Sequence, residues 1–356
     1  MSNMTVVFIL PNLGSGGAER VVTILSKALR ERDLAVDIVL MMTDLVQYPV
    51  PQGVGLVTLN TKGMSQIARL RVMRDYFRKQ KKSFRRVVAV PFQDNCLQYT
   101  LAAVAGLGIS VVACERNDPY QKGTRGLARF KANLPFALAK RCVFQTPDAR
   151  DYYRMGVEKK STVIVNPLIL RQDIHWQGQE SKNIISVGRL DPQKNQKILI
   201  DAFARFHEKF PAYTLEIFGE GSLRPQLQSQ IDGLGLENAV FLRGYADNIH
   251  DRLAQAAMFV LPSDYEGMSN ALIEALAIGV PVVTTDHPIG GARMLVEDGV
   301  SGLMTPVGDT DGLYRAMERL AADPQLAQML GKNSVRVREK LAVDAVVRQW
   351  LDVING

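Results

Sequence analysis

Short apolar runs alternate with amphipathic segments along the first half of the chain. Runs typical of buried strands occupy residues 5–10, 34–41, 85–91, 109–115 and 141–146. The segment after the first run has apolar residues at helical spacing, namely Val21, Val22, Leu25 and Leu29. Residues with this spacing fall on one face of a helix. The alternation therefore predicts an α/β fold, in which a parallel sheet is covered by helices.

The same rhythm begins again after residue 180. Five further strand patterns lie at 183–188, 213–219, 239–244, 258–263 and 280–285. Two successive series of this kind predict two Rossmann-like domains. The break in periodicity at 165–182 places their boundary between residues 1–168 and a second domain that starts at 169. Ligands of such sheets bind beyond the carboxyl ends of the strands, so we expect the reaction in a cleft between the two domains.

Composition agrees with a two-domain cytoplasmic protein. The 356 residues are 47% hydrophobic, which suffices for two cores, and no run approaches the ~20 apolar residues that span a bilayer. The amino terminus lacks a basic start and a small-residue cleavage site, and we interpret it as a first strand. Cys96, Cys114 and Cys142 lie far apart in apolar runs. We expect them to be buried, reduced thiols.

Charge is unevenly distributed. The net charge of +7 combines 25 Lys or Arg against 12 Asp or Glu in 1–168 with 18 against 24 in 169–356. Residues 62–86 alone carry ten Lys or Arg and one Asp, around an apolar stripe at Ile67, Leu70, Met73 and Phe77. The segment is either a solvated basic helix or an interfacial helix on an anionic membrane. It lacks the interleaved aromatics of a nucleic-acid platform, so no nucleic-acid partner is expected.

The most informative segment carries two glutamates separated by seven residues, Glu266 and Glu274. Ser269 is a credible N-cap, which puts Glu266 in the loop before a helix and Glu274 in its second turn. Both could be solvated helix residues. However, the helix is apolar nearly all round, so Glu274 is expected to be buried and to need a polar partner. The vicinal hydroxyls of a sugar are suitable donors to such a carboxylate.

Two cations follow the strand at 183–188. Arg189 and Lys194 lie five residues apart in a loop that contains a proline. On a generic surface loop such a pair would mean little. At the carboxyl edge of a sheet it is typical of a diphosphate clamp, because Arg offers a planar fork to phosphate oxygens and Lys a point charge.

Glycines follow several strands. Gly16 and Gly17 stand between the first strand and helix, where close backbone approach and the helix N-terminus favour an anion, although a plain βα turn explains them too. The spacing is not that of a dinucleotide fingerprint. Gly219 would let a base or phosphate approach the backbone, or would simply form a tight turn. Asp309 and Asp311 are interpreted as helix-capping residues, and the four histidines lack ligand spacing, so no metal site is expected.

Taken together, these motifs resemble the family 4 retaining glycosyltransferases of GT-B fold, of the type that builds bacterial surface polysaccharides. The resemblance covers the whole chain and rests on GGAER (16–20), VGRLDPQKN (187–195), IFGEG (217–221), the glutamate pair and GVPVVTTD (279–286). It implies two Rossmann-like domains facing across a cleft, with 169–340 binding the nucleotide sugar and 1–168 the acceptor. Residues 341–356 would form a terminal helix that packs back on the first domain.

The resemblance also implies roles for individual residues. Arg189 and Lys194 would bind the donor diphosphate, Glu274 the ribose hydroxyls and Glu266 the donor sugar. The remaining donor-binding positions would be Gly267, Met268, Ser269, Gly219, Gly16 and Gly17. Such enzymes use neither a metal nor another cofactor, because the cationic pair stabilises the leaving diphosphate.

One departure from the family concerns the acceptor. Many relatives have a histidine after a strand of the first domain, and here the stretch is Cys114-Glu115-Arg116-Asn117. Arg116 or Asn117 would serve the acceptor instead. Relatives with this stretch and a basic first domain build polysaccharides on lipid-diphosphate carriers, which implies a saccharide on a polyprenyl diphosphate.

The predicted function is therefore transfer of a hexose or N-acetylhexosamine from a nucleoside-diphosphate sugar, taken as UDP-linked, with retention of configuration. The enzyme would be cytoplasmic, with a peripheral position on the inner face of the membrane through residues 62–86. Two alternatives remain open: a sugar-nucleotide 2-epimerase of the same fold, and a non-catalytic nucleotide-sugar-binding protein of the membrane surface.

Overall fold

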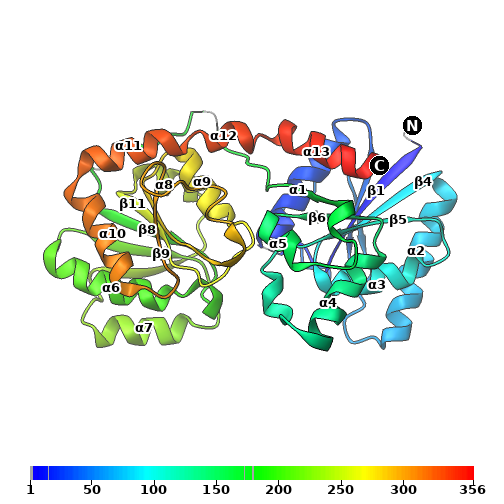
Figure 1. Cartoon of the computed structure of the whole chain (residues 1–356), viewed down its shortest axis with the longest axis horizontal. Coiled ribbons are helices and arrows are strands. Elements are labelled where there is room, and N and C mark those ends of the chain that lie inside the picture. Colours follow the sequence, from blue (N-terminus) through cyan, green and yellow to red (C-terminus); the bar gives the residue numbers. More distant parts are fainter. Residues whose placement is uncertain (1–2, 15, 172, 179) are drawn as a thin grey trace. The chain divides into compact units, whose positions relative to one another are not determined.

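The chain forms two compact α/β units (Figure 1). A computed structural model describes residues 3–14, 16–171, 173–178 and 180–356. Unit 1 comprises Met1–Ile169 and Leu341–Gly356, and unit 2 comprises Leu170–Lys340. The division falls at residues 169 and 170, in the stretch where the strand and helix periodicity of the sequence breaks down.

Unit 1 is built on a seven-stranded sheet with the order β3-β2-β1-β4-β5-β6-β7. All neighbouring strands are parallel. The strands are β1 (Met4–Leu10), β2 (Ala35–Leu40), β3 (Gly55–Thr58), β4 (Arg86–Pro91), β5 (Ser110–Cys114), β6 (Arg141–Phe144) and β7 (Ser161–Val163). The central strands are buried along almost their whole length, as expected for a parallel sheet covered on both faces.

The helices of unit 1 connect these strands. They are α1 (Gly17–Arg30), α2 (Gln66–Ser83), α3 (Asp94–Val104), α4 (Gly126–Leu138) and α5 (Pro147–Tyr152), with short 3₁₀ segments η1 (Pro119–Lys122) and η2 (Glu158–Lys160). The last helix of the chain, α13 (Val343–Asn355), also belongs to this unit. Its Trp350 is buried and stacks on Phe92 with ring centroids 6.0 Å apart, while Arg86 donates to the carbonyl of Ile354.

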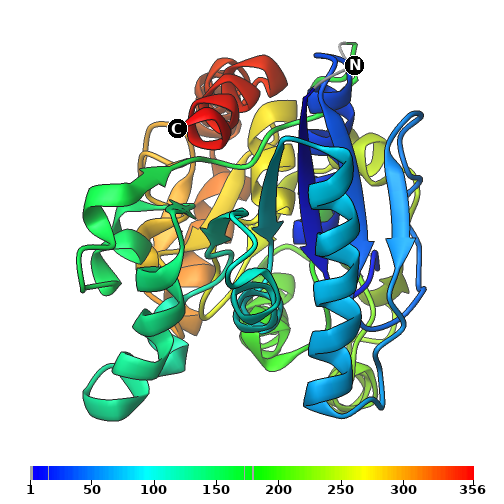
Figure 2. The ribbon, with the colours of Figure 1, turned by 90° about the vertical axis from the view of Figure 1, so that its right-hand side faces the viewer.

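Helix α2 turns its apolar stripe toward the protein. Figure 2 shows this helix, in blue, lying along the sheet of unit 1. Met73 and Phe77 are fully buried, whereas Ile67 is exposed. The interpretation of 62–86 as an interfacial helix is therefore wrong in one respect, because half of the stripe that would enter a membrane belongs to the core. The exposed cations of α2 are Arg71, Arg78, Lys79 and Lys82, whereas Arg69 and Arg74 form hydrogen bonds within unit 1.

Unit 2 is built on a six-stranded parallel sheet with the order β10-β9-β8-β11-β12-β13. The strands are β8 (Asn183–Val187), β9 (Thr214–Phe218), β10 (Val240–Gly244), β11 (Met258–Leu261), β12 (Val282–Thr285) and β13 (Leu303–Thr305). The helices are η3 (Pro192–Lys194), α6 (Gln196–Lys209), α7 (Arg224–Gly233), α8 (Ile249–Gln255), α9 (Asn270–Ile278), η4 (Pro288–Gly290), α10 (Thr310–Ala322), α11 (Pro324–Ser334) and α12 (Val337–Lys340).

Helix α9 follows the predicted capping pattern. The Ser269 hydroxyl accepts a hydrogen bond from the backbone N–H of Leu272, and Gly279 ends the helix with φ of 91°. Side chains on every face from Leu272 to Ile278 are buried. Ser269 as N-cap and the burial of Glu274 are both confirmed.

Candidate functional site

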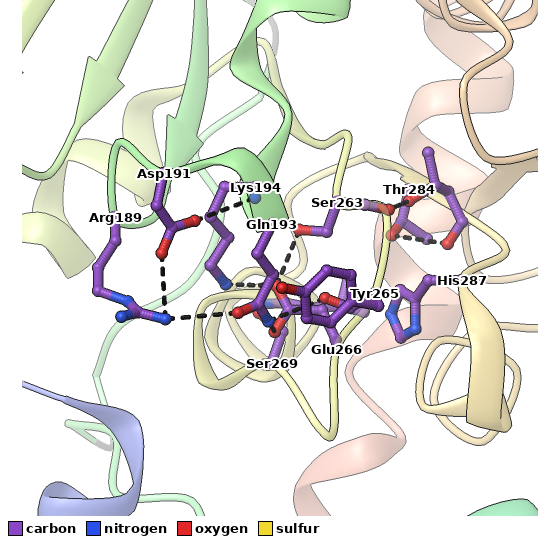
Figure 3. A network of polar contacts seen from close by, with 12 residues as sticks. Arg189, Asp191, Gln193, Lys194, Ser263, Tyr265, Glu266, Ser269, Thr284 and His287 are labelled. Atoms are coloured by element: carbon purple, nitrogen blue, oxygen red, sulfur yellow. Dashed lines mark hydrogen bonds and ion pairs between the residues drawn. The ribbon is translucent and has the colours of Figure 1, made fainter. Parts of the chain in front are cut away.

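The register of two neighbouring strands brings the predicted motifs of unit 2 together. Strands β8 and β11 are parallel neighbours, with Ile184 paired to Met258 and Ile185 to Phe259. The chain leaves both strands at the same edge of the sheet. One strand continues into the loop of Arg189 and Lys194, and the other into the loop of Glu266 (Figure 3). Parallel strand order thus joins two motifs that are more than 70 residues apart in sequence.

Glu266 is the centre of a polar network (Figure 3). It is 6% exposed and forms an ion pair with the ammonium group of Lys194. The Ser263 hydroxyl donates to Glu266 Oε1 at 2.8 Å, and the Gln193 amide donates to Oε2 at 3.3 Å. Burial alone would raise the pKa of the Glu266 carboxyl, but Lys194 and the hydrogen bond from Ser263 outweigh it and lower the pKa. Glu266 is therefore held as a carboxylate.

The two predicted cations have different surroundings. The Lys194 side chain is only 13% exposed and has Glu266 as its partner, whereas the Arg189 side chain is 64% exposed. Arg189 contacts Asp191 at 3.1 Å and the Gln193 amide oxygen at 3.4 Å. Arg189 is therefore open to solvent, whereas Lys194 already has a carboxylate partner within the protein.

Sequence reasoning missed the residues that hold this loop. The Asp191 carboxylate caps η3 by accepting from the Lys194 backbone N–H at 3.2 Å, and the Gln193 amide donates to the Tyr265 carbonyl at 2.9 Å. Asn195 donates to Asp264 at 2.7 Å. The Asp-Pro step was a readable capping signal, whereas the bonds between the two loops depend on strand order and left no local signal.

Glu274 has a histidine beside it that the sequence did not single out as a partner. Glu274 is 5% exposed on α9, and His250 Nε2 of α8 lies 3.2 Å from its Oε2. The two helices pack on each other. The buried carboxylate therefore has a polar neighbour within the protein, and a ligand hydroxyl would add to that contact.

Two glycines at the carboxyl edge of the unit 2 sheet lie so close to neighbouring backbone that a side chain would not fit. Gly219 has φ of +133°, and a Cβ there would lie 2.1 Å from the carbonyl oxygen of Gly188. A Cβ at Gly291 would lie 2.0 Å from the carbonyl oxygen of Gly267. These contacts explain both glycines by close packing of the loops. A donor-binding role of Gly219 stays a prediction, as it does for the buried residues Gly267, Met268 and Ser269.

His287 lies at the end of β12 on the side of Glu266 (Figure 3). It is fully buried, its Nδ1 is 3.3 Å from the Pro288 carbonyl oxygen, and its Nε2 has no hydrogen-bond partner among the described residues. Burial lowers the pKa of the imidazole, although the neighbouring Glu266 carboxylate opposes this effect. His287 is therefore neutral at physiological pH.

This burial predicts a measurable pH dependence. Below the ordinary His pKa of 6.5 the unfolded chain takes up a proton that folded His287 resists, so stability is lost as the pH falls. We expect His287→Gln to flatten the fall in the free energy of unfolding below pH 6.5. Urea titrations of both proteins across this range measure it. An equal slope in the variant would contradict the assignment.

The carboxyl edge of the unit 1 sheet carries a second polar group of residues. Gly16 is the N-cap of α1 and Gly17 its first residue. A Cβ on Gly16 would lie 2.2 Å from Glu19 Oε2, and Gln93 donates to Glu19 Oε1 at 3.0 Å. Gly16 is thus explained by the packing of a buried carboxylate, and its predicted contact with phosphate or acceptor stays a prediction, as does that of Gly17.

Arg116 and Asn117 follow β5 but differ in environment. The Arg116 guanidinium lies 3.9 Å above the Phe92 ring, and its Nη1 is 3.4 Å from the Asn166 side-chain oxygen. Its Nε and Nη2 are buried and have no hydrogen-bond partner among the described residues. Burial lowers the pKa of this guanidinium. Asn117 is exposed, and the acceptor role of both residues stays a prediction.

The aspartates that were rejected as metal ligands have structural roles. Asp309 accepts from the Gly312 backbone N–H at 2.8 Å and caps α10, which confirms the capping prediction. Asp311 forms an ion pair with Arg205. Among the described residues, no group of three His, Cys, Asp or Glu side chains is arranged to hold a metal ion. Cys96, Cys114 and Cys142 are buried reduced thiols, as predicted.

Comparison with known proteins finds a family that is similar to the unit holding this site. The sequence model of the family described as "Glycosyl transferases group 1" matches residues 171–337, nearly all of unit 2. Residues 171–337 are therefore similar to the group 1 glycosyl transferases.

Two relatives come from Campylobacter jejuni. One, the N-acetylgalactosamine-N,N'-diacetylbacillosaminyl-diphospho-undecaprenol 4-alpha-N-acetylgalactosaminyltransferase, is 38% identical over 161 residues, 45% of this chain and 43% of that protein. The other, an alpha-1,4-N-acetyl-D-galactosaminyltransferase acting on GalNAc-alpha-(1->4)-GalNAc-alpha-(1->3)-diNAcBac-PP-undecaprenol, is 25% identical over 99% of this chain and 98% of that protein. The chain spans less than half the length of the first curated relatives that it matches.

A solved structure confirms the fold. Anabaena HepE in complex with UDP and glucose has a TM-score of 0.82 at 20% identity, with 99% of both chains covered. At this identity the likeness shows the fold alone, and the predicted GT-B class with two Rossmann-like parallel sheets is confirmed. Among the described residues, no helix combines the length and apolar character needed to cross a membrane.

Proposed function

We propose that this protein is a retaining glycosyltransferase that moves a hexose or N-acetylhexosamine from a UDP-linked sugar to a saccharide acceptor in surface polysaccharide synthesis. The observation that carries the proposal is the network of Lys194, Glu266 and Arg189 at the carboxyl edge of the unit 2 sheet. Ligands of parallel α/β sheets bind at that edge, and unit 2 matches the group 1 glycosyl transferases.

The donor would be held by residues with separate tasks. Arg189, exposed on its loop, takes the diphosphate from solvent, and Lys194 lies between that anion and Glu266. Glu266, kept as a carboxylate, accepts hydrogen bonds from hydroxyls of the donor sugar, and Glu274 accepts from the ribose. As the anomeric C–O bond breaks, negative charge grows on the diphosphate and the two cations stabilise it.

The acceptor oxygen then bonds to the anomeric carbon on the face that the diphosphate leaves, which retains configuration. The departing phosphate oxygen takes the proton of the acceptor hydroxyl, so no side chain has to act as general base. Neither a metal nor another cofactor enters this scheme, because Arg189 and Lys194 supply the positive charge.

For the acceptor we propose a saccharide on a polyprenyl diphosphate. Two relatives are named for transfer to undecaprenol-linked saccharides. In unit 1 the buried donors of Arg116 that lack a partner suit an anionic or hydroxyl-bearing group of such an acceptor. We further propose a cytoplasmic enzyme that reaches its acceptor at an anionic membrane surface, to which the cations of residues 62–86 are attracted.

A sugar-nucleotide 2-epimerase is the rival activity. The two are separated by incubating the protein with UDP-sugars in the presence and absence of undecaprenyl-diphosphate saccharides and analysing the products. Transfer requires the acceptor and releases UDP. Conversion of the donor to its epimer without acceptor would overturn the proposal in favour of the rival.

Donor binding is tested separately by thermal unfolding with a panel of nucleotide sugars. A ligand at one hundred times its Kd adds about 2.7 kcal/mol of stability. We expect one UDP-sugar to raise the melting temperature of the wild type and to have less effect on Glu274→Gln. An equal shift in that variant would contradict the ribose assignment, and no shift with any nucleotide sugar would contradict the donor site.

A further inference from the structure

Helix α4 of unit 1 carries an apolar stripe on its outer face. Four large apolar side chains are exposed: Leu127 by 66%, Phe130 by 50%, Leu134 by 38% and Leu138 by 65%. At about 100° per residue these positions fall within about 80° of the helix circumference. Soluble proteins rarely leave such a contiguous apolar surface without a binding partner.

The core does not need this stripe, because the other side of α4 is already anchored. Phe136 is buried, with its ring centroid 4.2 Å from that of Tyr153. Asn133 is also buried; its amide donates to the Arg129 carbonyl and its oxygen accepts from the Arg154 backbone N–H at 2.6 Å. Helix α4, labelled in Figure 1, is thus fixed to unit 1 by one face, and its exposed leucines and phenylalanine lie on the other.

Cations predominate in the chain segment that carries the stripe. Residues 119–147 contain six Lys or Arg and no Asp or Glu. Arg125, Lys131 and Lys140 are exposed, next to or along the helix that carries the stripe. Arg129 also belongs to this helix and donates to the Tyr152 carbonyl. Apolar residues flanked by cations are the composition of helices that lie in the interface of an anionic bilayer.

We propose that α4 is the membrane-docking element of this protein, with Leu127, Phe130 and Leu134 entering the acyl boundary of an anionic lipid bilayer. A second copy of the chain is the less suitable occupant, because in a symmetric dimer the stripe meets itself and brings like charges together. The role of α2 is then limited to long-range attraction, since its Met73 and Phe77 are in the core. The inference rests on the proposed function, because a polyprenyl-linked acceptor lies in a bilayer and is the reason for the protein to dock there.

The test is co-sedimentation of the full chain with vesicles of phosphatidylcholine alone and of equal parts phosphatidylglycerol and phosphatidylcholine. We expect the wild type to bind the anionic vesicles and the triple variant Leu127→Gln/Phe130→Gln/Leu134→Gln to bind them at least about tenfold more weakly. The matched control, Leu234→Gln/Met329→Gln, removes two exposed apolar residues of unit 2 and should bind like the wild type. Equal binding by the triple variant and the wild type would overturn the proposal.

Four further measurements keep the result interpretable. Melting temperatures establish that the triple variant is folded. Phe130→Trp, compared with the wild type, should show a blue-shifted emission on adding anionic vesicles, and an unshifted emission would count against insertion. Light scattering that shows a wild-type dimer and a monomeric triple variant would assign the stripe to self-association and overturn the proposal. Transfer to a soluble acceptor analogue, measured without vesicles, should be unchanged in the triple variant, so docking and the proposed activity can fail independently.

Discussion

Replacing Lys194 with methionine should destabilise unit 2 by about 3 kcal/mol, because it leaves a buried carboxylate without its cation. Glu266 is 6% exposed and Lys194 13% exposed in its side chain, so water would screen the remaining charge poorly. The ion pair Lys209–Glu318 offers a matched control, since Lys209 is 60% exposed. Lys209→Met should change the free energy of unfolding little, as is usual for surface pairs.

The contribution of Glu266 to the free energy of unfolding should depend on pH with opposite sign in Lys194→Met and in the wild type. In the wild type the pKa of Glu266 is lowered, so its contribution to stability is present above the ordinary value and is lost as the pH falls. Without Lys194, burial would raise the pKa of Glu266. The loss in free energy of unfolding caused by Lys194→Met should then be smallest at acidic pH and grow as the pH rises.

A double-mutant cycle separates the stability of the pair from its function. Adding Glu266→Gln to Lys194→Met removes the buried charge, and the amide can still receive the hydrogen bond from Ser263. We expect the double variant to recover most of the lost stability but not glycosyl transfer. If Lys194→Met alone unfolds at the same urea concentration as the wild type, the pair is not an important contributor to stability.

The fold could largely be predicted from the sequence, because the apolar patterns of strands and of helices are both local features of the chain. Strand and helix patterns repeat along the chain, and the helix bearing Glu274 shows its burial directly in its apolar composition. A periodic stripe does not say which way it faces, however. Met73 and Phe77 of the α2 stripe face the core, while the α4 stripe faces solvent, and only the tertiary structure distinguishes the two.

The site was predicted as a set of residues rather than as a network. The ion pair of Lys194 with Glu266 depends on β8 and β11 being neighbours in the sheet, and strand order is not written in local sequence. For the same reason nothing pointed to His250 beside Glu274 or to Gln193 between the two loops. What the structure adds is an asymmetry: one of the two cations is paired within the protein and the other is presented to solvent.

That asymmetry leads to a prediction for Arg189. Its side chain is 64% exposed and contacts Asp191 and Gln193 only at the loop surface, so Arg189→Ala should leave the melting temperature unchanged. If the guanidinium stabilises the leaving diphosphate, the variant should lose about a hundredfold or more in turnover. Since the interaction strengthens in the transition state, kcat should fall by more than KM rises.

Arg205 supplies the matched control for this experiment. It is 52% exposed, belongs to the same unit and forms a comparable surface ion pair with Asp311, but it lies on α6 rather than at the carboxyl edge of the sheet. Arg205→Ala should therefore retain wild-type turnover. Arg189→Lys should recover part of the lost activity, because the ammonium group keeps the positive charge but lacks the planar fork that binds two phosphate oxygens side by side. Near-wild-type turnover in Arg189→Ala would remove Arg189 from the donor site and leave Lys194, paired with Glu266, as the cation assigned to the diphosphate.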